Sequence, residues 1–179
     1  MKSAVSGVLL VLGLVSVCFG QGDGGLKKTH RAPIATSAAP VSEAEADATF
    51  QHVADLFKAI LHINVTNSHA KSSTALVTKA EVVAEMTRFY KAAQPAFTLT
   101  PKLVKVDLPR VTIDKPSEKA NLIMLIERGC VGNYGPLATG KTNSLSVQEF
   151  GDAVGYFLCR IAECTHTPST KWTPYLHGN

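Results

Sequence analysis

Beyond its first twenty residues, the chain has no long hydrophobic run. An apolar stretch at residues 8–17 follows Lys2 and precedes Cys18-Phe19-Gly20, which is the arrangement of a secretory signal peptide with its cleavage site. The stretch is too short to cross a bilayer, and no later stretch is longer. The sequence therefore predicts a signal peptide at residues 1–20, a secreted, extracellular protein and no membrane span.

Cysteine is scarce, with four residues in the whole chain. Removal of the signal peptide takes Cys18 away and leaves Cys130, Cys159 and Cys164. An odd number allows at most one internal bridge, which excludes a small disulfide-rich scaffold.

The net charge is small, and aromatic residues are also few. The net charge of +4 becomes +3 once Lys2 is removed, and aromatic residues make up 7% of the chain. Because no basic stripe interleaved with aromatics occurs, no nucleic-acid partner is expected. Histidine pairs at zinc-binding spacing and the G-x-S-x-G pattern of a nucleophilic serine are missing as well, so no enzymatic activity is predicted.

Helical periodicity dominates the part of the chain that remains. A helix at residues 118–128 follows Pro116 and ends at Gly129. Three further helices begin at capping boxes of the S/T-x-x-E pattern, each followed by apolar residues at helical spacing. These boxes are Ser42 and Glu45, Thr78 and Glu81, and Ser146 and Glu149. The sequence predicts an all-α fold with four main helices.

The composition divides the chain further. Residues 21–40 are rich in small residues and proline and read as a flexible basic arm. Residues 41–164 form the helical domain. Residues 165–179 form an extended tail that Trp172 and Tyr175 are expected to fasten to the helices. Asn64-Val65-Thr66 is an acceptor sequence for N-glycosylation, which predicts an exposed loop at Asn64.

Two helix–loop–helix units repeat with an offset of 68 residues, from Glu81 to Glu149, and Val77 matches Leu145 at the same offset. The run at residues 144–150, SLSVQEF, resembles the second half of an EF-hand. In that family an apolar residue fills loop position 8, and a glutamate at position 12 binds the calcium ion with both oxygens. The resemblance implies a minimal two-stranded pairing between the loops, with Glu81 and Glu149 as the metal ligands.

The loops depart from the family where most calcium ligands should lie. Calcium takes six to eight oxygen ligands, so one carboxylate and a few hydroxyls fall short. Calcium binding is therefore expected to be weak or lost. Loop positions 1, 3 and 5 hold Ala70, Ser72 and Thr74 in the first unit and Ala138, Gly140 and Thr142 in the second.

Residues 135–142, GPLATGKT, also fit the G-x-x-x-x-G-K-S/T pattern of a phosphate loop. A nucleotide site needs a buried apolar strand before that loop, and the preceding GCVGNY is no such strand. A phosphate loop, a degenerate calcium loop and a plain helical hairpin remain open for this segment, and a chance match to the phosphate pattern is favoured.

The cysteine pairing can be argued from helix geometry. Residues five apart in a helix are separated by about 7.5 Å of rise, which is too far for a disulfide. A Cys159–Cys164 bridge therefore requires the helix to break near Ala162. In a helical hairpin Cys130 would lie about 20 Å from Cys159. We expect a Cys159–Cys164 bridge, with Cys130 buried or linking two chains.

The leading interpretation is a secreted, non-enzymatic EF-hand-like protein with weak or lost calcium binding. It would be a structural or interaction component of an extracellular matrix, by analogy a mineralised one, with a matrix or protein partner. Two alternatives stay open: a secreted helical carrier of a lipid or small apolar ligand, and a signalling or defence protein released by proteolysis. An enclosed apolar cavity would favour the carrier. A solid core with Val77 paired to Leu145 would favour the EF-hand-like protein.

Overall fold

The computed structural model describes residues 38–66, 74–113, 115–139, 142–168 and 171–172. In this part of the chain the regular elements are helical, which confirms the predicted all-α fold with four main helices. The α-helices are α1 (Glu43–Leu56), α2 (Lys79–Ala93), α3 (Pro116–Glu127), the short α4 (Pro136–Thr139) and α5 (Val147–Cys164). A π-helical turn, Phe57–Leu61, extends α1, and 3₁₀ turns lie at Gln94–Ala96 and Leu108–Arg110.

All three predicted capping boxes are formed. At each helix start the hydroxyl oxygen of the N-cap residue accepts a hydrogen bond from the backbone N–H of the glutamate three residues later. The glutamate carboxylate in turn accepts from the N-cap backbone N–H, as in Ser146 and Glu149, at 2.8 Å. These bonds satisfy amide groups that a helix start leaves without partners. Helix α3 starts differently, with Pro116 in its first turn and no side-chain cap.

The N-terminal ends of α1, α2 and α5 meet in one junction, built on Val41, Val77 and Leu145. Val41 N–H donates to the carbonyl oxygen of Leu145 at 2.9 Å, and Val77 N–H donates to that of Val41 at 3.2 Å. Antiparallel bridges place each of these three residues opposite the other two. The bridges join Pro40 to Ser146, Ser42 to Leu76, and Thr78 to Ser144.

A second set of hydrogen bonds surrounds this junction. The donors are the first amides of the three helices, and the acceptors lie two residues before the junction residues. The pairs are Glu43 to Ala75 at 2.7 Å, Lys79 to Asn143 at 2.8 Å and Val147 to Ala39 at 2.9 Å. The pairing of Val77 with Leu145 that the EF-hand resemblance implies is therefore present, but Val41 joins it as a third member. Residues 39 and 40, predicted to belong to the arm, take part in the fold.

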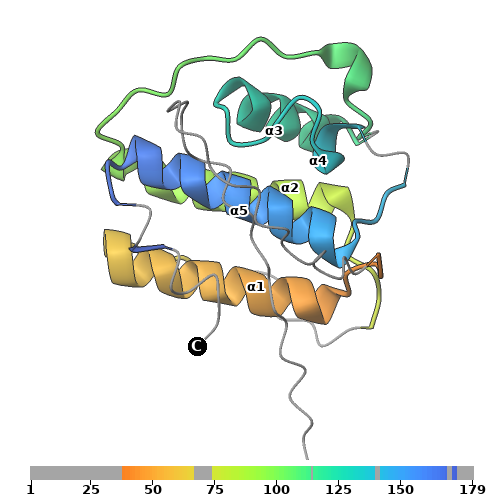
Figure 1. Cartoon of the computed structure of the whole chain (residues 1–179), viewed down its shortest axis with the longest axis horizontal. Helices are drawn as coiled ribbons and strands as arrows, with labels where there is room; N and C mark the ends of the chain where they lie inside the picture. Colours follow the sequence, from red (N-terminus) through yellow and green to blue (C-terminus); the bar gives the residue numbers. More distant parts are fainter. Residues whose placement is uncertain (1–37, 67–73, 114, 140–141, 169–170, 173–179) are drawn as a thin grey trace, which may run out of the picture.

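Because their first turns meet, α1, α2 and α5 run in the same direction, and the segments between them return along the molecule (Figure 1). The end of α3 also lies against the later turns of α5, where Arg160 Nε donates to the carbonyl oxygen of Arg128 at 3.1 Å. The expected hairpin, with the end of α3 beside the start of the last helix, is therefore wrong.

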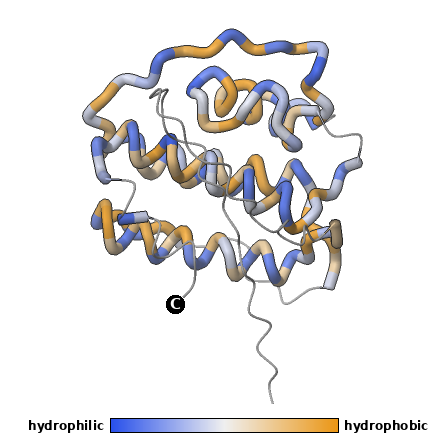
Figure 2. Tube along the Cα trace, viewed as in Figure 1, coloured by the Kyte–Doolittle hydropathy of each residue, from blue (hydrophilic) through white to orange (hydrophobic). Residues whose placement is uncertain are grey.

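The core is filled by phenylalanines from α1, α2 and α5. Phe50 contacts Phe89 at 6.0 Å and Phe150 at 5.6 Å between ring centroids, and Phe57 contacts Phe89 at 5.1 Å. Trp172 packs edge-on against Phe57 at 5.9 Å, as expected for a residue that fastens the tail. Tyr175 lies outside the described residues. Figure 2 shows apolar and polar residues alternating along the helices, as expected for helices that bury one face.

The connector, residues 97–113, joins α2 to α3 over the side of the molecule away from α1 (Figure 1). Its residues 103–106 form no strand. The connector is held by α3 and the turn after it: Val104 N–H donates to Glu127 O at 2.8 Å. Asn133 Nδ2 donates to Lys105 O at 2.8 Å. Within the described residues, no helix combines the length and apolarity that crossing a membrane would need.

Candidate functional site

The two glutamates predicted as calcium ligands cap the helices that they begin. Glu81 Oε2 accepts from the N–H and the hydroxyl of Thr78 at 2.8 and 2.7 Å. Glu149 Oε2 accepts from the same groups of Ser146 at 2.8 and 2.9 Å. One carboxylate oxygen of each glutamate is therefore engaged, whereas the EF-hand arrangement uses both oxygens on the ion.

A lysine of the protein lies near the second of these carboxylates. Lys79 is buried, and this burial lowers the pKa of its ammonium group, while the charge of Glu149 acts in the opposite direction. Loss of water, and secondly the negative charge of Glu149, raise the pKa of Asp152. The ammonium group of Lys79 therefore offsets part of the negative charge at the start of α5.

Among the described residues, the carboxylate of Asp152 is affected by the charge of Glu149, but the two do not belong to a larger cluster of possible metal ligands. Within the described ranges, no cluster of three or more His, Cys, Asp or Glu side chains could hold a metal ion. Several of the predicted loop positions, including Ala70, Ser72 and Gly140, lie outside those ranges. Within the described residues, the two predicted calcium ligands are therefore separate glutamates, each of which caps a helix.

The segment that fits the phosphate-loop pattern is partly helical. Residues 136–139 form α4, in which Leu137 and Ala138 are buried in the core. The Thr139 hydroxyl donates to Gly135 O at 3.1 Å. Gly140 and Lys141 lie outside the described residues. The middle of the pattern is thus used to pack α4, which fits the favoured explanation that the match arose by chance.

Exposed apolar side chains gather elsewhere, on the connector and the residues beside it. Seven large hydrophobic residues of the described chain are exposed, and six of them belong to this region. We call this surface the connector face and define it by those six residues with two lysines. Its members are Leu99, Leu103, Val104, Leu108, Tyr134, Tyr156, Lys102 and Lys105.

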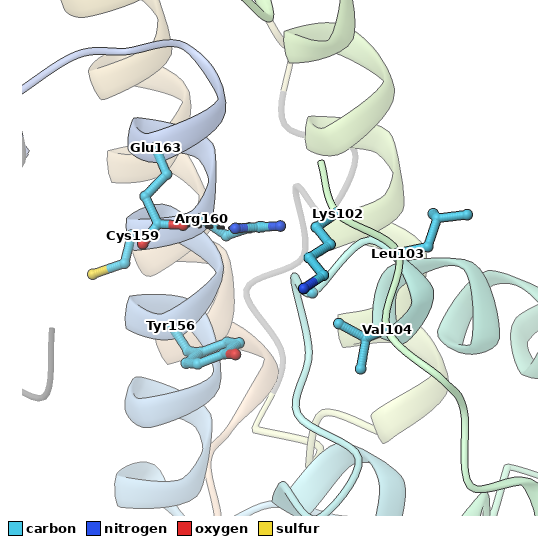
Figure 3. A pocket seen from close by; sticks show the side chains of 8 residues that line it. Lys102, Leu103, Val104, Tyr156, Cys159, Arg160 and Glu163 are labelled. Atoms are coloured by element: carbon cyan, nitrogen blue, oxygen red, sulfur yellow. Dashed lines mark hydrogen bonds and ion pairs between the residues drawn. The ribbon is translucent and has the colours of Figure 1, made fainter. Parts of the chain in front are cut away.

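The first groove of the connector face lies between the connector and α5 and has a volume of about 470 Å³. Val104 and Tyr156 place apolar side chains at this groove, and Lys102 and Arg160 project toward it from opposite sides (Figure 3). Leu103 also lines the groove, but its side chain points away from α5. Arg160 is fixed there, because Nε donates to Arg128 O and Nη1 pairs with Glu163 at 2.7 Å.

A second groove, of about 600 Å³, continues along the connector and is lined by Lys105, Leu108 and Tyr134, among others. Arg110 lies over the ring of Tyr134, with 4.6 Å between its guanidinium carbon and the ring centroid. Its Nε pairs with Asp107 at 2.8 Å. Both grooves are open to solvent, as a surface that receives another molecule requires.

The charge balance of the connector face is positive. Arg110 and Arg160 are neutralised by Asp107 and Glu163. Among the described residues, Lys102 and Lys105 make no ion pair. The face therefore offers two uncompensated ammonium groups beside apolar side chains. Such a surface can bind an anionic, partly apolar partner.

Asn64, the predicted glycosylation site, is exposed and follows the π-helical turn that ends α1. His62 ends that turn in a left-handed conformation, with φ of 59°. An exposed residue just beyond a helix end is accessible to a glycosylating enzyme, so modification of Asn64 stays a prediction.

The cysteine arrangement differs from the expected one. Cys130, Cys159 and Cys164 are thiols in the structure, and α5 is unbroken as far as Cys164. The helix break near Ala162 that a Cys159–Cys164 bridge requires is therefore absent. Cys130 also lies at the end of α3 that packs against the later turns of α5, instead of near the start of α5. It is buried, which was one of the two roles expected for it, the other being a link between two chains.

Comparison with protein-family models, with curated proteins and with solved structures gives no match for this chain. Two features escaped the sequence reasoning. Val41-Ser42 repeats the aliphatic-S/T-x-x-E pattern of the other two helix starts, so the three-way junction had a visible signal. The connector face had a weaker signal: Lys102 and Lys105 flank Leu103 and Val104 in the sequence.

Proposed function

We propose that this chain is a secreted, non-enzymatic, EF-hand-like interaction protein of an extracellular matrix, with weak or lost calcium binding. Its binding surface is the connector face, and its partner is an acidic segment of another matrix protein that also carries apolar side chains. The observation that carries the proposal is the gathering of six exposed apolar residues beside the unpaired Lys102 and Lys105.

The apolar part of this surface supports a protein partner. Leu103 is 63% exposed and Tyr134 is 69% exposed, so both lie outside the core. Covering such apolar side chains with a partner removes their surface from water, which is favourable. Gathered apolar residues on a soluble surface are typical of binding sites. Lysines beside them select a partner by charge and speed its association.

The filled core supports the interaction protein over the carrier. Phenylalanines from three helices occupy the space in which an enclosed ligand would lie. The two grooves of the connector face are open, so a lipid chain in them would stay largely in contact with water. The engagement of Glu81 and Glu149 in capping boxes supports the weak or lost calcium binding.

The binding test uses two acidic polymers of known composition as probes. Poly-glutamate tests the charge of the connector face, and a glutamate–tyrosine copolymer tests charge together with apolar contact. With the chain immobilised, we expect both polymers to bind, the copolymer more tightly, and poly-lysine not to bind. Binding should weaken as salt rises, because exposed charges are screened.

Matched variants decide whether binding occurs at this face. Lys102→Glu with Lys105→Glu should weaken poly-glutamate binding by about tenfold or more. Lys58→Glu with Lys91→Glu changes the net charge equally at exposed sites on other elements, and should weaken it less than about twofold. Leu103→Ser should remove the preference for the copolymer, whereas Leu76→Ser, also at an exposed leucine, should not. Equal effects of the two lysine pairs would show that overall charge, and not the connector face, governs binding.

A further inference from the structure

The end of α3 and the last turns of α5 are in direct contact. Arg160 Nε donates to the carbonyl oxygen of Arg128 at 3.1 Å, and Arg128 lies two residues before Cys130. A Cβ at Gly129 would lie only 3.3 Å from the same Nε, so the backbone beside Cys130 touches the Arg160 side chain. Arg160 precedes Cys164 by one helical turn, about 6 Å of rise. The end of α3 is thus held against the last turns of α5, beside Arg160 and one turn before Cys164.

Cys164 is enclosed from the other side by the start of the connector. The N–H groups of Thr98 and Leu99 donate to the carbonyl oxygen of Cys164 at 2.9 and 3.1 Å. Tyr90 packs against Phe97 at 5.3 Å between ring centroids. Burial is the main cause that raises the pKa of Tyr90, and the charges of Cys130 and Cys164 act in the same direction.

Both thiols are removed from solvent. Cys130 is 0% exposed and Cys164 is 2% exposed. Burial, with the neighbouring Cys164 as the largest charge effect, raises the pKa of Cys130 to about 12. A thiol with such a pKa is almost entirely protonated at neutral pH and reacts slowly. A bond between these cysteines would therefore form while the chain folds, before both sulfurs are enclosed.

Cys159 is placed differently on α5. Five residues at 3.6 residues per turn put it about 140° around the helix from Cys164. Cys159 is partly exposed and lines the first groove of the connector face, where its sulfur points away from Lys102 (Figure 3). The unbroken helix keeps its Cα beyond disulfide range of that of Cys164.

We propose that Cys130 and Cys164 form a disulfide when the chain folds under oxidising conditions, and that this bond ties the end of α3 to the end of α5. The oxidant is a low-molecular-weight disulfide such as glutathione disulfide. One protein thiolate attacks it, which forms a mixed disulfide and releases one glutathione. The second protein thiolate then attacks the mixed disulfide, forms the Cys130–Cys164 bond and releases the second glutathione. Each protein thiol gives up its proton to water, and the oxidant takes the two electrons.

The sequence allows a direct test, because trypsin separates the three cysteines. Cleavage after Arg128, Lys141, Arg160 and Lys171 leaves Cys130 in peptide 129–141, Cys159 in 142–160 and Cys164 in 161–171. The chain without residues 1–20, and therefore without Cys18, is reduced, unfolded and refolded with glutathione and its disulfide, alkylated under denaturing conditions and digested without reduction. We expect peptides 129–141 and 161–171 to be joined and Cys159 to be alkylated. A bridge from Cys159 to Cys130 or Cys164, or alkylation of all three, would overturn the proposal.

Single substitutions control for non-specific pairing. Cys159→Ser should leave the bond in place, whereas Cys130→Ser and Cys164→Ser should each abolish it without creating a new bridge. A disulfide that closes a loop of this length stabilises a fold chiefly by restricting the unfolded chain. The oxidised Cys159→Ser protein should melt roughly 5–10 °C above its reduced form. Equal melting temperatures of the two forms would contradict a bond compatible with the native packing.

Discussion

At the scale of single residues, glutamates at the third helical position hold this fold together through short hydrogen bonds to their own N-caps. The S-x-x-E pattern was readable from the sequence because both partners lie within one turn. What the sequence left open was the partner of each carboxylate. A glutamate at that position can cap a helix or bind an ion, and the surroundings decide which. Buried Lys79 beside Glu149 is such a surrounding, and it comes from another helix.

The ionised carboxylate of Asp152 destabilises the fold, so its effect on stability depends on pH. Its pKa in the fold is raised above the usual 3.8 by loss of water and by Glu149. The protonated carboxyl is therefore favoured in the fold, and the stability that this gives is lost as the pH rises through the raised pKa. We expect Asp152→Asn to raise the melting temperature at pH 7 and to leave it unchanged at pH 3, where the carboxyl is protonated in both states.

Asp55→Asn provides the control for Asp152, because it removes one exposed negative charge from another helix. It should not reproduce the gain at pH 7. Calorimetric melting of the three proteins at both pH values makes the comparison. A gain from Asp152→Asn that persists at pH 3 would show that the effect is not electrostatic.

At the scale of elements, the sequence predicted the helices well and their packing poorly. Periodicity and capping boxes are local, and they located α1, α2, α3 and α5. Direction depends on contacts between residues far apart, such as Val41 with Leu145, which no local pattern contains. The EF-hand resemblance led to the pairing of Val77 with Leu145, but it also implied two hairpins. The third strand-like segment, at Val41, and the shared direction of the helices could be known only from the assembled chain.

The three-way junction can be tested at Val41, which is fully buried between the starts of α2 and α5. Val41→Ala removes buried methyl groups and should cost roughly 2 kcal/mol of the free energy of unfolding. Amide exchange should quicken at Val77, whose N–H donates to the carbonyl oxygen of Val41. Leu76→Ala, at a half-exposed neighbour, should stay within about 0.5 kcal/mol. Equal losses in the free energy of unfolding for the two substitutions would contradict a specific contribution of the junction to stability.

At the scale of the whole molecule, the side that holds the core differs from the side that carries the proposed binding surface. The junction and the phenylalanine core join α1, α2 and α5, while the connector carries most of the exposed apolar residues over α3 and the later turns of α5. This division explains why sequence reasoning reached the scaffold before the site. Core positions repeat with the helical period, whereas the connector face consists of irregular backbone whose neighbours are set by tertiary contacts.

The proposed function includes calcium binding at Glu81 and Glu149 that is weak or lost. The deciding measurement is the melting temperature in 1 mM calcium and in chelator. A site of millimolar affinity adds only about 0.4 kcal/mol at that concentration, so we predict a shift of at most about 2 °C. A micromolar site would add about 4 kcal/mol and raise the melting temperature by roughly 8–16 °C. A rise of that size, lost in Glu149→Gln and kept in the matched capping-box variant Glu45→Gln, would contradict the account.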